Sequence, residues 1–171
     1  TGPAADYAKV SDQKAQNTAG GTFTSGAWQT RTLNTEDSDD DSILTLASNQ
    51  ITLSAGTYIC RISCPAEYVD KHQARLQNVT AATTLIIGTG EYAYTGGIGR
   101  TRSEIVGQFT VVGSQALEVQ HQCQTTNGTN GYGQPMNFTT EVYTQAEFWK
   151  IDASPSLLTP IQSYAKVSDR K

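Results

Sequence analysis

Three observations predict an all-β fold, a jelly-roll β-sandwich. The chain has 24 Thr against nine Leu, and β-branched residues such as threonine favour strands. Apolar and polar residues alternate with a period of two in several segments, as half-buried strands require. Turn signals rich in glycine and asparagine separate these segments, with no long amphipathic helix between them. Roughly eight to ten short strands with this spacing are typical of a sandwich or jelly roll.

The individual strands follow from where the alternation runs. It is clearest near residues 116–124, where Leu117, Val119, His121 and Cys123 alternate with glutamine and glutamate. Such a pattern gives a strand one buried face and one wet face. The other expected strands lie near residues 21–24, 27–33, 43–47, 50–54, 57–64, 72–79, 83–88, 104–112 and 141–151.

The last of these strands departs from clean alternation, because apolar residues fall on both of its faces. They include Tyr143, Phe148 and Trp149. Either the strand lies in the middle of the sandwich under extra loop cover, or its outer face is buried against another subunit. The second alternative is favoured, since contiguous exposed aromatic surface usually marks an interface. We therefore expect these three side chains at a subunit interface.

His121 has two interpretations. On an apolar face between Val119 and Cys123, a histidine is ordinarily packed and hydrogen-bonded to backbone. In a trimer it would instead lie near the symmetry axis, where three copies would form a pH-sensitive contact or hold an anion or a metal. His121 is therefore included among the candidate interface residues.

Composition and charge exclude several classes of protein. The net charge is −4, with a sequence pI near 5.1, whereas nucleic-acid binders carry basic surfaces. No run approaches the ~18 apolar residues of a membrane span, so neither nucleic acid nor membrane insertion is expected. A chain of this length buries about 70% of its surface on folding, so it needs no disulfide or metal ion to stabilise its core. The three cysteines, Cys60, Cys64 and Cys123, are accordingly expected to be buried free thiols.

A repeat links the two ends of the chain. The segment Tyr7–Lys14 recurs as Tyr164–Lys171 with seven of eight residues identical. One interpretation is a tandem array in which each unit opens with this segment; the alternative is a pair of matching strands or clasps within one domain. Loose composition flanks both copies. We expect an N-terminal connector over residues 1–19, a jelly-roll domain over 20–151 and a C-terminal connector over 152–171.

Four stretches resemble domains of bacteriophage virion proteins, tail fibres and head fibres in particular. They are GGTFTSGAWQTR at 20–31, LSAGTY at 53–58, HQARL at 72–76 and EVQHQC at 118–123. The similarity runs from Tyr7 to Ile151. It implies a structural protein located in the virion, with other virion proteins as partners. Where such a domain forms a terminal knob, the resemblance also implies recognition of a glycan or protein on the host surface.

Two shorter patterns resemble the C1q and tumour-necrosis-factor (TNF) jelly rolls. They are Ala55–Tyr58, which opens a strand, and the aromatic last strand Glu147–Ile151. The resemblance implies a ten-stranded jelly roll packed as a tight homotrimer around a threefold axis, consistent with the doubly apolar last strand. The chain shows no collagen-like Gly-X-Y stalk of the C1q type.

Two polar loops are the expected sites of receptor contact, because loops on a rigid β scaffold commonly carry recognition. The first holds Tyr92, Tyr94, Arg100 and Arg102. Aromatic rings stack on sugar faces, and arginine forms paired hydrogen bonds to carboxylates or phosphates. The alternative is a solvated loop without a ligand.

The second candidate loop is the glycine-rich segment 127–135. It contains Asn127, Asn130 and Tyr132 between two expected strands, and it is long enough to project. A purely connecting role is the alternative. Both loops are therefore candidates for contact with a host-surface glycan or protein.

Motifs for cofactors, metals and catalysis are weak. Gly88–Ala93 matches G-x-G-x-x-A, but the glycines that follow cannot propagate the helix that dinucleotide binding needs, so no cofactor is expected. The acidic run Glu36–Asp41 lacks the EF-hand spacing and glycine, which favours a solvated loop over a Ca²⁺ site. With two histidines and no G-x-S-x-G, an enzyme is not expected. A sugar-binding module and a structural fibre spacer remain the rival functions.

Overall fold

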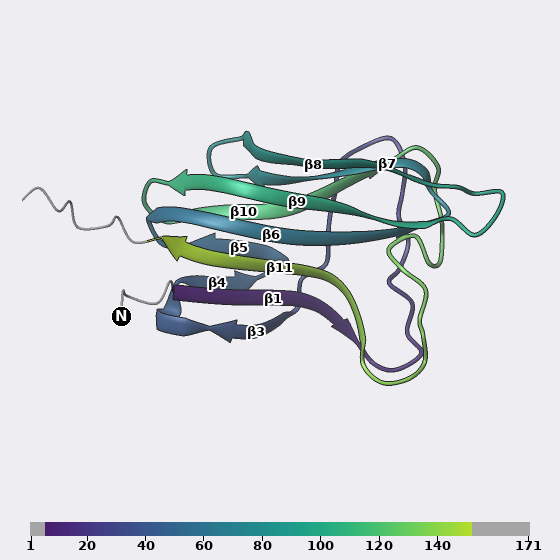
Figure 1. Ribbon diagram of the computed structural model, residues 1–171, viewed down its shortest axis with the longest axis horizontal. Coiled ribbons are helices and arrows are strands. Elements are labelled where there is room, and N and C mark those ends of the chain that lie inside the picture. The colour runs from purple at the N-terminus through teal and green to yellow at the C-terminus, as the bar shows by residue number, and fades with distance from the viewer. Residues whose placement is uncertain (1–5, 152–171) are drawn as a thin grey trace, which may run out of the picture.

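The computed structural model describes residues 6–151, and the expectations for residues 1–5 and 152–171 lie outside the described part, including the second copy of the 7–14 segment. Two antiparallel sheets pack face to face (Figure 1). The five-stranded sheet has the order β3 (Thr35–Asp39), β1 (Asp6–Lys14), β11 (Glu141–Ile151), β6 (Gly56–Glu67) and β9 (Arg100–Val111).

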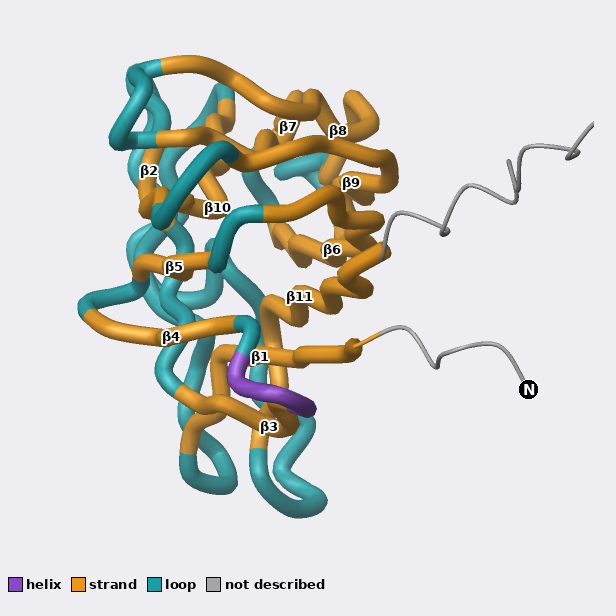
Figure 2. Tube along the Cα trace, turned by 90° about the vertical axis from the view of Figure 1, so that its left-hand side faces the viewer, coloured by secondary structure: helices purple, strands orange, loops and turns teal. Residues whose placement is uncertain are grey.

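The second sheet is six-stranded. Its path is β4 (Leu44–Ala47), β5 (Gln50–Leu53), β10 (Gln115–Cys123), β7 (Asp70–Asn78) and β8 (Thr83–Ala93), with β2 (Gln29–Thr30) beside β10. A 3-10 turn, η1 (Asp40–Ser42), joins β3 to β4. Figure 2 looks roughly along the strands and shows β4, β5 and β10 in one layer and β1, β11 and β6 in the other. The expected jelly-roll sandwich is confirmed.

The main hydrophobic core fills the space between the sheets. Alternation points the apolar side of each long strand inward, so that residues such as Ile62, Leu76 and Leu117 are fully buried. Phe109 packs edge-on against Phe148 at 6.5 Å between ring centroids. Such packing of large side chains supplies most of the stability of a sandwich.

The expected N-terminal connector is wrong for residues 6–14. They form β1, which pairs with β11 on one side and β3 on the other. Ala8 and Val10 enter the core, but a register shift between Ser11 and Gln13 interrupts the alternation. The acidic segment 35–39 forms β3 although strand propensity disfavours it, because its backbone completes the sheet edge beside β1. The folded domain therefore begins by Asp6 rather than at residue 20.

The two strands expected near 21–24 and 27–33 are largely wrong. This segment runs irregularly except for β2 and an isolated bridge between Phe23 and Asn127. Side chains of this segment are nevertheless buried, among them Arg31 and Leu33, and Leu33 belongs to the main core. The alternation of apolar and polar residues in this segment thus reflects which side chains are buried, although the backbone does not form a continuous ladder of strand hydrogen bonds.

The described chain enters and leaves the sandwich at the same end. Asp6 on β1 pairs directly with Lys150 on β11, and Figure 1 shows both ends on one side. The longer loops, 15–28, 94–99 and 124–140, gather at the opposite side, here called the loop end. Within residues 6–151 no helix is long and apolar enough to cross a membrane. The three cysteines are free and buried, as expected.

A candidate functional site at the loop end

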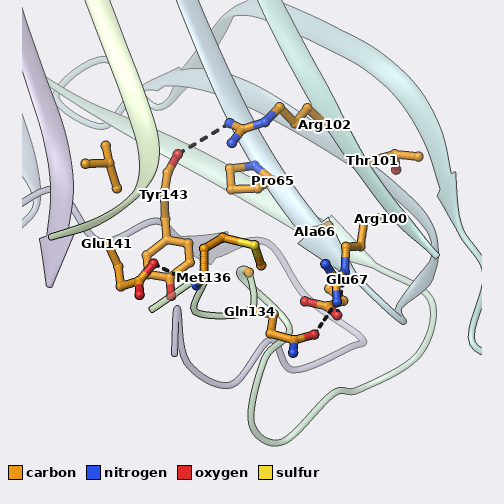
Figure 3. A pocket seen from close by; sticks show the side chains of 12 residues that line it. Pro65, Ala66, Glu67, Arg100, Thr101, Arg102, Gln134, Met136, Glu141 and Tyr143 are labelled. Carbon is orange, nitrogen blue, oxygen red and sulfur yellow. Dashed lines mark hydrogen bonds and ion pairs between the residues drawn. The ribbon is translucent and has the colours of Figure 1, made fainter. Parts of the chain in front are cut away.

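A cavity of about 400 Å³ lies on the outward side of the five-stranded sheet at the loop end. Its walls come from β6, β9 and β11 and from the loop 133–136, which folds over the sheet. Figure 3 shows Arg100, Glu67 and Gln134 on one side of the cavity and Arg102 with Tyr143 on the other. Both arginines that were expected in a receptor-contact loop, Arg100 and Arg102, therefore line one cavity.

Arg100 and Glu67 form the charged floor of this cavity. Arg100 Nε donates to Glu67 Oε1 at 2.9 Å, and the same guanidinium donates to Gln134. The Glu67 side chain is only 1% exposed, and its Oε2 has no hydrogen-bond partner among the described residues. Because this oxygen is itself buried, Glu67 holds the Arg100 guanidinium at the cavity wall rather than offering an acceptor to a ligand.

Arg102 lies across the cavity and is held by fewer contacts. Its Nη1 donates to Ser63 Oγ at 3.1 Å and makes a long contact of 3.5 Å to the Tyr143 carbonyl. Arg102 is otherwise exposed. The remaining guanidinium donors match the geometry of a carboxylate or phosphate.

Glu141 shapes the cavity rather than offering a reactive group. Its carboxylate accepts the backbone N–H groups of Asn17, Met136 and Asn137 at 2.7–3.1 Å. These hydrogen bonds, first that from Met136, lower the pKa of Glu141 below its usual range. Glu141 therefore ties the loop over the sheet at neutral pH.

The exposed aromatic pair lies on the neighbouring hairpin. Tyr92 and Tyr94 stack with 6.1 Å between centroids and are each 52% exposed. The loop between the strands expected near 83–88 and 104–112 is shorter than predicted, because β8 continues to Ala93 and β9 begins at Arg100. The reason is Gly88, where a Cβ would lie 2.9 Å from the Glu104 carbonyl oxygen. That glycine permits close approach of two strands instead of making a turn.

The second expected contact loop turns inward. Tyr132 is buried between Phe23, at 4.6 Å between centroids, and the Arg31 guanidinium, at 3.9 Å, so its assignment to receptor contact is wrong. Asn127 donates to the Glu67 carbonyl and accepts the N–H of Asn130. These residues fasten the loop to the sandwich.

Three of the four expected interface side chains are buried within their own chain. Phe148 and His121 are fully buried inside the sandwich, and Tyr143 is covered by loops, donating its hydroxyl to the Thr18 carbonyl at 2.6 Å. Their assignment to a subunit interface is wrong, and for Tyr143 the alternative of extra loop cover holds. Trp149 alone points outward, packing on Tyr7 at 5.4 Å between centroids.

The sequence analysis did not predict a buried polar cluster beneath the cavity, formed by His72, His121 and Arg31. His72 Nδ1 and His121 Nε2 share a hydrogen bond of 2.9 Å. Arg31, fully buried, donates to Thr144 Oγ1 at 2.7 Å and to the Pro65 carbonyl. Burial, then the charge of Arg31, lowers the pKa of His72 to about 4 and that of His121 well below its usual range. The available signal was that both histidines fall on inward positions of expected strands.

The acidic run has a local role. Asp39 accepts the backbone N–H groups of Ile43 and Leu44, which fixes the crossing from β3 to β4. Across residues 6–151 there is no cluster of three or more histidine, cysteine, aspartate or glutamate side chains arranged to hold a metal ion.

Comparisons with known proteins bear on the fold. No protein-family model and no curated protein matches the sequence. Murine APRIL superposes with a TM-score of 0.57 at 8% identity, over 86% of this chain and 99% of that one. The globular domain of zebrafish complement 1qA gives 0.55 at 13% identity, over 86% and 98%. The chain has a C1q/TNF-like jelly-roll fold.

A third solved structure shares this jelly roll. The PRD1 vertex protein P5 superposes with a TM-score of 0.57 at 11% identity, over 88% of this chain and 100% of that one. The whole sandwich, rather than one sheet, is therefore common to these proteins. Identities this low establish architecture only.

Proposed function

We propose that the chain is a non-enzymatic structural protein of a bacteriophage virion, a homotrimeric fibre-knob or decoration domain that contacts the host surface through its loop end. The resemblance of residues 7–151 to phage fibre domains and the shared architecture with the PRD1 vertex protein support the virion role. The described ends lie opposite the loop end, as a projecting knob requires.

The observation that carries the trimer is an apolar stripe on the outward face of the five-stranded sheet, formed by Tyr7, Trp149, Ile59 and Val106. The register places Trp149 between Tyr7 and Ile59 on three adjacent strands. Ile59 is 41% and Val106 64% exposed. A threefold ring is built from contacts between two different patches of each copy. Here the centre of the stripe is one patch, and it packs against the other patch, the β9 edge of the next subunit.

Light scattering after size-exclusion chromatography tests this arrangement. The protein should elute with three times the 18.4 kDa mass of one chain. Val106→Arg should give a monomer, because three arginines would be desolvated without partners. Val112→Arg, in the turn after β9 where the valine is 82% exposed, should leave the trimer intact. A wild-type monomer, or a trimeric Val106→Arg variant, contradicts the proposed assembly.

The virion assignment has its own test. Peptides of this chain should co-sediment with intact phage particles through a density gradient, and antibodies against the Tyr92–Tyr94 hairpin should decorate the particle surface. Absence from purified particles contradicts the assignment even if the protein is trimeric.

A further inference from the structure

A second cavity, of about 490 Å³, opens on the six-stranded sheet, away from the apolar stripe. Its lining includes Trp28, Lys71, Gln73, Glu91, Gln122 and Gln124. The volume falls in the range of small-molecule sites.

Trp28 is held in place across the outward face of the sheet. Trp28 directly precedes β2, whose Thr30 pairs with Gln120 on β10. The Arg75 guanidinium on β7 lies 4.2 Å from the centroid of the indole and is itself fixed by two hydrogen bonds to Gln120 Oε1. The indole thus forms a rigid apolar wall that also faces the cavity.

Two of the three glutamines that line the cavity differ from the other amides of this sheet, whereas the third, Gln73, donates its Nε2 to the Gly88 carbonyl at 2.9 Å. Gln50, Gln77 and Gln120 all spend their amide groups on neighbouring side chains. Gln122 and Gln124, which line the cavity, make no side-chain hydrogen bond to any residue of the described 6–151. Lys71 and Glu91 likewise keep their donors and acceptors available. Unused hydrogen-bonding groups therefore gather beside the indole of Trp28.

The chemistry of this set selects a class of ligand. An indole packs against the C–H face of a sugar ring, while amides both donate to and accept from hydroxyl groups. Among the lining side chains, Lys71 and Glu91 carry opposite charges. The Arg75 guanidinium next to them is already held by the indole and by Gln120, so the cavity does not favour an anion. We propose that this cavity binds a neutral pyranose sugar, with Trp28 as the stacking platform and Gln122 and Gln124 as partners of its hydroxyls.

The site is independent of the proposed trimer. It lies on the six-stranded sheet, whereas the apolar stripe lies on the five-stranded sheet, so a monomer presents it as well. The Arg102 side of the first cavity, by contrast, is suited to anions, which separates the two sites by ligand charge.

Saturation-transfer NMR tests the proposal on the whole chain. The probes are methyl glycosides of glucose, galactose, mannose and N-acetylglucosamine, with sialyllactose as the anionic arm. At least one neutral glycoside should bind saturably in the millimolar range. Trp28→Ala should weaken that binding at least tenfold and Gln122→Ala several-fold, while Gln50→Ala, a matched amide outside the cavity, should leave it unchanged.

Several outcomes overturn the proposal. They are no saturation transfer to any neutral glycoside at 20 mM, full binding in Trp28→Ala, or preference for sialyllactose that Trp28→Ala does not reduce. Unchanged thermal melting of Gln122→Ala ensures that its weaker binding reports the site rather than the fold. A monomer in light scattering together with sugar binding would reject the trimer and keep this site.

Discussion

The two ends of the sandwich interior are built differently. Toward the described termini, β6, β9, β10 and β11 enclose a continuous apolar core with Tyr58, Phe109 and Phe148. Toward the loop end, a small apolar group around Phe23 is interleaved with charged and polar side chains. Arg31 Nη2, Glu67 Oε2 and His121 Nδ1 there have no hydrogen-bond partner among residues 6–151.

The difference shows how one jelly roll combines a stable body with a shaped end. Apolar packing is non-directional and tolerates many sequences, whereas hydrogen bonds fix long loops in one arrangement. The loops 15–28 and 124–140 are joined by such bonds, for example from Gly20 N–H to the Gly133 carbonyl at 2.8 Å. We infer that the core stabilises the fold and that the polar end positions the cavity.

The largest expected effect comes from the apolar end. Phe148→Ala should lower the free energy of unfolding by about 3–5 kcal/mol, because the deletion leaves a cavity among rings that cannot collapse into it. Urea unfolding at pH 7 followed by tryptophan fluorescence measures the loss. Met136→Ala, at a half-exposed position in the loop end, should change it little. A loss below 1 kcal/mol for Phe148→Ala contradicts the core described here.

Acid should act on the polar end. The pKa of His72 is lowered to about 4 by burial and by Arg31, so the unfolded chain takes up the proton first as the pH falls. Stability from this group is complete above about pH 6.5 and declines toward pH 4, by about 3 kcal/mol in total. The urea midpoint is measured between pH 7 and pH 5, because most carboxylates take up protons only below this range. His72→Gln should flatten this decline, and an equal slope in that variant contradicts the assignment.

Arg31→Met should separate the two roles of that side chain. At pH 7 we expect a loss of about 1–3 kcal/mol, since the Thr144 hydroxyl and Pro65 carbonyl lose a donor. Between pH 7 and 5 the variant should be less acid-sensitive than the wild type, because the charge that lowers the pKa of both histidines is gone. Differential scanning fluorimetry across pH detects both effects; a steeper acid loss would be the opposite result.

The smallest expected effect compares the cysteines of the two ends. Burial raises the pKa of Cys60 and Cys64 to about 12 and that of Cys123 to about 11, so none reacts readily in the folded state. Cys123 lies in the polar end and should be alkylated several-fold faster, through local opening. Peptide mass spectrometry after iodoacetamide treatment reports the order, and simultaneous labelling of all three would indicate global unfolding alone.

Sequence alternation predicted the sandwich because its long strands bury one face each. The strand near 141–151 agrees with β11 at both ends. The alternation did not predict β1 and β3. Their pairing depends on backbone partners distant in sequence, and their side chains are mostly polar. Periodicity carries information on burial, and it carries little on which polar segment completes an edge.

The candidate site was predicted only in part. Arg100 and Arg102 were singled out by residue type and do line a cavity. Glu67, the partner of Arg100, comes from β6, and no local pattern connects it to that arginine. Tyr132 was misplaced because a glycine-rich loop reads as projecting even when an aromatic in it anchors the loop inward. Trp28 fell within the strand expected near 27–33, but no sequence pattern placed it beside Gln122.

The pairing of Asp6 with Lys150 has a consequence for how such units combine. A chain that enters and exits at one point does not gain the length of the sandwich when another copy is added. Copies joined through these ends would be attached side by side to a common stem. Each copy would point its loop end away from the junction and would fold without disturbing its neighbours.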